Sequence, residues 1–186
     1  MGVSRKTRAI EDILPLAPLQ QGLLFHSVYD EQSPDVYTVQ VDFELDGALD
    51  LDVLRTAAET LLRRHSVLRA GFRQRKSGDW AQLVMREVPL SWRVVENPES
   101  VEDELAADRW RRFDLAKPPL LRFTVLKLAE DQHHFVVTSH HLLLDGWSLP
   151  VLVRELLRLY AEKGDGRSLP SVRPYRDYLS WLSQQD

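Results

Sequence analysis

Two adjacent histidines, His140 and His141, stand between an apolar run and the pair Asp145-Gly146. Residues 133–139 combine aromatic and β-branched side chains, which favours a buried strand. Residues 149–161 repeat apolar side chains at helical spacing, which predicts an amphipathic helix. The imidazoles would then lie where a strand ends and a helix begins, and a helix start presents free backbone N–H groups. Titratable side chains in such a place indicate a functional loop rather than core packing.

Each histidine admits more than one interpretation. Neighbouring residues of a strand point to opposite faces, so His140 and His141 are poorly placed to bind one metal ion together. Asp145 alone does not complete a zinc site, and we therefore predict no metal. A structural, hydrogen-bonded role is favoured for His140. For His141 we favour catalysis or substrate positioning, because an Asp-Gly loop and a helix start could supply the other parts of an acyl-transfer site.

The residues at the start of the predicted helix are candidates for supporting roles. Gly146, Trp147 and Ser148 could hold an oxyanion or position a substrate. Ser148 is also a candidate N-cap. A nucleophilic triad is disfavoured, because no serine is convincingly placed as a nucleophile elbow.

Asp145 could act as a base, as an ion-pair partner or as a turn former. If its carboxylate is buried among apolar groups, it needs a cation nearby. The candidates are Arg64, Arg69 and Arg73. Arg69 stands out because it lies inside an otherwise apolar stretch, residues 68–72, that predicts a strand.

Composition excludes several classes of protein. The chain has 186 residues, 44% of them hydrophobic and 28% charged, which is typical of an ordinary globular domain. A net charge of −4 gives no support for nucleic-acid binding. The absence of cysteine removes disulfides, thiol catalysis and cysteine-ligated zinc. Without an apolar run of roughly 20 residues, no membrane span is expected, and we expect a cytoplasmic protein.

The pattern along the chain predicts a single folded unit. Residues 1–12 are expected to be a linker, residues 13–163 the folded part, and residues 164–186 a connector followed by a short helix. Strand pairs joined by short turns, combined with helices, predict an α+β two-layer sandwich with a largely antiparallel sheet and helices on one face. The predicted strands are 37–45, 68–72, 80–85, 90–95, 120–128 and 133–139, and helices are predicted after Pro18 and at 51–64, 99–112, 149–161 and 175–184.

Four segments carry a family resemblance. Residues 140–148, His-His-Leu-Leu-Leu-Asp-Gly-Trp-Ser, are similar to the HHxxxDG motif of condensation domains from nonribosomal peptide synthetases. Residues 17–25 resemble the first core motif of that family, residues 64–72 the second, and residues 175–181 the fourth. The segments follow the family order and span nearly the whole chain.

The resemblance implies one lobe of a chloramphenicol acetyltransferase-like fold. Residues 13–163 would be the N-terminal subdomain, and residues 164–186 would lead toward a C-terminal lobe that this chain lacks. In the family, two lobes enclose a tunnel that donor and acceptor peptidyl carrier proteins approach from opposite sides. Their 4′-phosphopantetheine arms bring the acyl thioester and the amine that form a peptide bond. No cofactor is expected to bind the domain directly.

The resemblance also assigns roles to single residues. It implies that His141 is catalytic, that Asp145 is structural and that Arg69 is the ion-pair partner of Asp145. His140 and Gly146 would complete the structure of the loop. Because both carrier arms are held between two lobes, this chain alone is expected to be inactive.

Departures from the commonest motifs suggest a subclass. Gly22 and Ser66 stand where domains that join two L-residues usually have Arg and Glu. Together with Leu144 and the run 146–150, they resemble the subclass that accepts a donor ending in a D-residue. Two alternatives from other classes remain, a free-standing acetyltransferase-like enzyme and a non-catalytic platform of the same fold that recruits a carrier protein or another partner.

Overall fold

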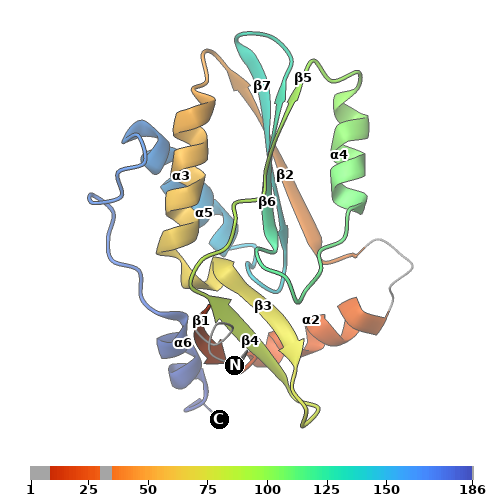
Figure 1. Cartoon of the computed structure of the whole chain (residues 1–186), viewed down its shortest axis with the longest axis vertical. Helices are drawn as coiled ribbons and strands as arrows, with labels where there is room; N and C mark the ends of the chain where they lie inside the picture. The colour runs from red at the N-terminus through yellow and green to blue at the C-terminus, as the bar shows by residue number, and fades with distance from the viewer. Residues whose placement is uncertain (1–8, 30–34, 186) are drawn as a thin grey trace, which may run out of the picture.

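The computed structural model describes residues 9–29 and 35–185, and Figure 1 shows how its elements are arranged. The strands are β1 (Ile10–Leu14), β2 (Thr38–Asp46), β3 (Ala70–Gln74), β4 (Trp80–Met85), β5 (Trp92–Glu96), β6 (Leu121–Lys127) and β7 (Gln132–His140). The helices are α2 (Pro18–Tyr29), α3 (Leu51–Arg64), the 3-10 helix η1 (Ser66–Arg69), α4 (Val101–Trp110), α5 (Ser148–Ala161) and α6 (Tyr175–Leu182).

The larger sheet has four strands in the order β2-β7-β6-β5, antiparallel except for the parallel pair β5 and β6. Gln40 and Phe43 of β2 point to opposite faces because they are three residues apart. Gln40 donates to the carbonyl of Leu105 in α4 at 3.0 Å, whereas Phe43 packs against the main core. Helices α3 and α5 lie on one side of this sheet and α4 on the other (Figure 1). The predicted α+β class is confirmed, but helices cover both faces of this sheet rather than one.

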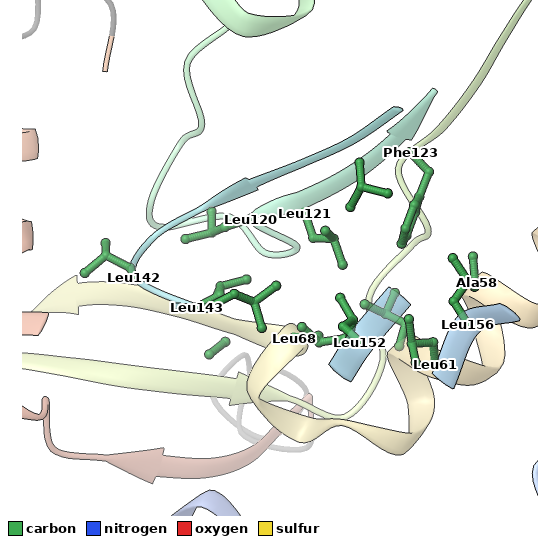
Figure 2. Close-up of a cluster of buried hydrophobic side chains, with 14 of the residues drawn as sticks. Ala58, Leu61, Leu68, Leu120, Leu121, Phe123, Leu142, Leu143, Leu152 and Leu156 are labelled. Carbon is green, nitrogen blue, oxygen red and sulfur yellow. The ribbon is translucent and has the colours of Figure 1, made fainter. Parts of the chain in front are cut away.

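The core lies between the larger sheet and helices α3 and α5. Helix α3 buries five side chains on one face, as its 3.6-residue period predicts. These side chains pack with side chains of α5 and β6 in one buried hydrophobic cluster. Figure 2 shows part of the cluster and labels Ala58, Leu61, Leu68, Leu120, Leu121, Phe123, Leu142, Leu143, Leu152 and Leu156. Strand β7 is buried from Phe135 to His140 because both faces of the sheet are covered.

The smaller sheet has three strands in the order β1-β4-β3 and is antiparallel. Strands β3 and β4 form the predicted hairpin, which turns at Gly78 with a φ of 95° that favours glycine. The linker predicted over 1–12 is wrong for residues 10–12, which pair with β4 as part of β1. Residues 1–8 lie outside the described residues. The strand predicted at 68–72 begins only at Ala70, since η1 occupies the preceding four positions.

The C-terminal segment returns to the N-terminal part of the chain. Helix α6 confirms the short helix predicted at 175–184, although it ends two residues earlier. Arg176 of α6 forms an ion pair with Asp12 of β1, with Nε at 3.1 Å from Oδ2. Pairing between distant ends of the chain therefore joins α6 to the smaller sheet.

Candidate active site

Strand β7 ends at His140, and residues 141–147 form a loop, here called the histidine loop, that leads into α5. The backbone N–H of His141 donates to the carbonyl of Tyr37 at 2.9 Å, which fixes the loop start beside β2. Leu142, Leu143 and Leu144 are all buried. All three belong to the hydrophobic core, and in Figure 2 Leu143 points toward the other labelled side chains whereas Leu142 points away from them. Core packing therefore anchors the first half of the loop, while residues 145–147 are exposed.

The ring of His141 is half-buried, and its Nδ1 lies 2.9 Å from the carbonyl oxygen of Leu144. A carbonyl oxygen only accepts, so Nδ1 carries the proton in this hydrogen bond. In the neutral imidazole, Nε2 then holds the lone pair. Within the described part of the chain, Nε2 has no hydrogen-bond partner. His141 thus offers a basic nitrogen on a ring whose orientation is fixed.

The ring of His140 has the opposite arrangement. It is fully buried, with 0% of its surface exposed, and its Nδ1 accepts the N–H of Leu142 at 3.1 Å. Its Nε2 lies 3.0 Å from Oδ2 of Asp35, so the neutral ring carries its proton on Nε2 and donates it to that carboxylate. Both nitrogens are occupied, which fits the structural role predicted for His140.

Asp35 is a buried partner that the sequence pattern does not indicate. Burial by itself would raise the pKa of its carboxyl, but hydrogen bonds from His140 and from the N–H of Tyr37 outweigh it. The charge of Arg112 acts in the same direction, and the pKa of Asp35 is lowered. Asp35 precedes His140 by 105 positions, so no local spacing links the two residues.

The expected ion pair between Asp145 and Arg69 is contradicted by the structure. The Asp145 carboxylate is exposed, and its Oδ1 accepts the N–H of Ser148 at 2.7 Å. The Ser148 hydroxyl lowers the pKa of Asp145 most, burial opposes it, and the N–H groups of Ser148 and Trp147 lower it further. The loop aspartate is thus stabilised by the start of α5, where the helix dipole favours an anion.

Arg69 is buried, as its apolar sequence context indicated, but it has other partners. Its guanidinium donates to Oε2 of Glu11 at 2.6 Å and to the carbonyl of Met85 at 2.9 Å. One nitrogen also donates to the carbonyls of Leu62 and Arg63, at 2.8 and 2.7 Å. Arg69 therefore joins the C-terminal end of α3 to β1 and β4, and it satisfies helix carbonyls that lack intrahelical partners.

The three predicted oxyanion or positioning groups are not equivalent. The N–H of Ser148 is already bonded to Asp145, and Ser148 is the first residue of α5 rather than its N-cap, a position that Trp147 holds. Trp147 has 87% of its surface exposed. A Cβ built at Gly146 would meet no atom within 4 Å. Gly146 and Trp147 are therefore the open positions of the histidine loop.

The described residues contain neither a cluster of metal-binding side chains nor a helix that could span a membrane. Among them, no three His, Asp or Glu side chains come together as a group that could hold a metal ion. In the same part of the chain, every helix is too short or too polar to cross a bilayer.

Solved structures define the class of fold. The starter condensation domain of rhizomide synthetase matches with a TM-score of 0.79, at 18% identity, over 94% of this chain and 44% of that one. The condensation domain of the monacolin K polyketide synthase matches with a TM-score of 0.81, at 21% identity, over 93% and 39%. This is the chloramphenicol acetyltransferase-like fold that the sequence predicted.

Sequence comparison then places the chain in a family. The family model described as condensation domain matches residues 10–186, and the chain belongs to that family. One protein of the linear gramicidin synthase of Brevibacillus parabrevis is 39% identical over 95% of this chain. Bacitracin synthase 3 of Bacillus licheniformis is 38% identical over 95%. The chain spans only 2% and 3% of those two proteins.

Proposed function

We propose that this chain is the N-terminal part of a condensation domain that joins a carrier-bound donor acyl thioester to a carrier-bound acceptor amine. The observation that supports it most is the ring of His141. Its Nδ1 is bonded to the Leu144 carbonyl, which leaves Nε2 as an acceptor beside an exposed loop. An acceptor nitrogen of fixed orientation is what removal of a proton from an attacking amine requires.

The proposed chemistry forms a C–N bond and breaks a C–S bond. An α-amine has a pKa of about 7.7–8.0, so part of it is already neutral near pH 7. When it attacks the thioester carbonyl, its nitrogen must lose a proton. Nε2 of His141 accepts that proton or orients the amine, since it is the ring nitrogen that holds a lone pair. The proton then passes to the departing thiolate, and the peptide product remains on the acceptor carrier.

The proposal includes partners outside this chain. Donor and acceptor peptidyl carrier proteins would deliver their substrates on 4′-phosphopantetheine, and a C-terminal lobe would complete the tunnel. The chain's coverage of 39% and 44% of two solved condensation domains supports a further lobe. Without that lobe His141 would face water, where the groups that hold an amine and a thioester together are incomplete. We therefore propose that the chain alone is inactive. We also propose that the reaction takes place in the cytoplasm.

A condensation assay with loaded donor and acceptor carriers tests this function. The two-lobe domain that contains these residues should form the amide, and the 186-residue chain should form little. Equal rates from both would refute the need for a second lobe. Failure of the two-lobe domain with every loaded donor would refute condensation. The free-standing acetyltransferase alternative predicts instead that the chain alone acetylates a small acceptor from acetyl-CoA and sediments as a trimer.

The donor subclass is a finer part of the proposal. Gly22 and Ser66 support a donor that ends in a D-residue, as do Leu144 and the run 146–150. The same assay with the two epimers of one donor decides the matter. A faster reaction with the L-epimer would contradict the assignment.

A further inference from the structure

The peptide groups of Leu142 are held from two sides by buried side chains. Its N–H donates to Nδ1 of His140 at 3.1 Å, and its carbonyl accepts from Nε2 of Gln20 at 2.8 Å. Gln20 is 7% exposed and His140 is 0% exposed. Because Leu142 directly follows His141, these two bonds fix the backbone that carries the His141 ring.

The amide of Gln20 is itself held in one orientation. Its Oε1 accepts the N–H of Ala17 at 2.9 Å and Nε2 of Gln82 at 2.8 Å. If the amide were flipped, an NH₂ group would face two donors, and its oxygen would face the carbonyl of Leu142. Such mismatches in a buried site each cost the desolvation of an unpaired polar group. The donor toward Leu142 is therefore set by Ala17 and Gln82 together.

Gln82 connects this arrangement to the smaller sheet. It lies in β4, is 0% exposed, and donates from Nε2 to the carbonyl of Pro15 at 2.8 Å as well as to Gln20. We call Gln20 and Gln82 the amide pair. It spans α2, β4 and the histidine loop, three segments far apart in the sequence. An apolar pair of similar volume would fill the same space without desolvating two amides, so packing alone does not account for it.

The histidine loop has a second fixed point at Leu144, and this one involves the His141 ring. The carbonyl of Leu144, two residues after Leu142, accepts from Nδ1 of His141. A rotation of the Leu142 peptide would move the residues between these points and weaken that bond. A fraction of the His141 rings would then carry the proton on Nε2 instead of Nδ1. In that tautomer Nε2 has no lone pair to accept a proton.

We propose that Gln20 and Gln82 are positioning residues for His141, acting through the carbonyl of Leu142. Neither glutamine is proposed to contact a substrate. Their role is to keep the histidine loop in the conformation that leaves Nε2 of His141 unprotonated. The catalytic consequence rests on the proposed function, whereas the effect on the tautomer does not.

The test is nuclear magnetic resonance of the ¹⁵N-labelled 186-residue chain, in which long-range ¹H–¹⁵N spectra distinguish the two tautomers of His141. In the wild type the Nδ1–H form should dominate. In Gln20→Met, loss of the hydrogen bond to the Leu142 carbonyl should lower the ratio of Nδ1–H to Nε2–H by roughly 2-fold to 12-fold. The double variant Gln20→Met/Gln82→Met leaves neither side-chain amide without its partner and keeps the test valid if the single variant does not fold.

Gln40→Met is the matched control. Gln40 is a partly buried glutamine whose side chain forms hydrogen bonds with α4 and makes none with the histidine loop. In this variant the ratio of the two His141 tautomers should equal that of the wild type. A folded amide-pair variant with an unchanged ratio would overturn the proposal, as would an equal change in Gln40→Met. In the two-lobe domain, the amide-pair variants should lower kcat more than they raise KM. If the tautomer shifts but no condensation is found in the wild type, the proposed function fails and the positioning role stands.

Discussion

Two polar regions of this molecule differ in how completely their side chains are bonded. Beneath α4, Oδ1 of Asp108 accepts from Nε of Arg122 at 2.7 Å, and Oδ2 accepts from Thr138 at 2.5 Å and from Gln40 at 3.1 Å. Arg122 lies 4.2 Å from the ring centroid of Phe113. Only 3% and 4% of the Asp108 and Arg122 side chains are exposed. This region is dry and fully paired.

The histidine loop is the contrasting region. His141 is held through Nδ1 alone, and the carboxylate of Asp145 is exposed at the start of α5. The comparison shows where chemistry is available. In the network beneath α4, bonding fixes the fold and leaves no atom for a substrate. In the loop, bonding fixes one side of a ring and leaves the other side open.

Replacement of Asp108 should have the largest effect on stability. Asp108→Ala leaves Arg122 as a buried, unpaired charge, which costs about 3–5 kcal/mol. Urea unfolding measures the change. The control is Asp103→Ala, an exposed carboxylate in the first turn of the same helix, where the loss should be about 0.3–1 kcal/mol. An equal loss of unfolding free energy in both variants would show that the network beneath α4 is not shielded from solvent.

The comparison also shows what the sequence can and cannot predict. Helix 51–64 and strand 80–85 match the structure residue for residue, because the helix has a 3.6-residue period and the strand follows a hairpin turn at residues 77–79. The sequence indicates a buried Asp–Arg pair, but at Asp145 and Arg69 rather than at Asp108 and Arg122. Residues 99–112 predict a charged surface helix, and nothing local marks Asp108 as buried. Its partners come from strands that only tertiary packing brings together.

Strand β1 and Asp35 illustrate the same limit. Residues 10–12 resemble a linker because they follow a polar segment, and their strand exists only through pairing with β4. By contrast, His141 directly follows the end of β7, close to the strand end that residues 133–139 predict. Local spacing predicts which residues can do chemistry, whereas the residues that orient them are set by long-range contacts.

Acid should weaken the molecule through its buried carboxylates. Burial would raise the pKa of Asp108 and Glu155, but hydrogen bonds and the charges of Arg122, His65 and Arg64 lower it. A carboxyl with a lowered pKa stabilises the fold above its ordinary value, 3.8 for Asp and 4.5 for Glu, and this stability is lost as the pH falls through the folded value. Urea unfolding at about pH 5 and about pH 3 should show the loss, and Asp108→Asn should show less of it. Equal stability at both pH values would contradict this.

Asp145→Ala should cost less than Asp108→Ala, about 0.5–1.5 kcal/mol, because its exposed carboxylate loses one hydrogen bond from the first N–H of α5. Asp145→Asn should retain most of that stability. In a double-mutant cycle with Arg69→Met, the two effects should add within about 0.5 kcal/mol, since their carboxylate and guanidinium have different partners. A coupling energy well above that value would restore the ion pair that the structure contradicts.

Gly146→Ala should have the smallest effect on stability, within about 0.5 kcal/mol, because its Cβ would meet no atom of the chain. In the two-lobe domain, a substrate arm lying against this backbone would be displaced by the added methyl group. The condensation rate should then fall on the order of 10-fold to 100-fold. An unchanged rate would show that no substrate packs against Gly146.

His141→Ala in the two-lobe domain tests the central claim most directly, with amide formation from loaded carriers and unfolding free energy measured on the same samples. The rate should fall by about 10²-fold to 10⁴-fold, the usual contribution of a positioned acid–base group. The unfolding free energy should change by no more than about 1.5 kcal/mol, since one hydrogen bond to Leu144 is lost. Near-wild-type turnover by a folded His141→Ala variant would contradict the account.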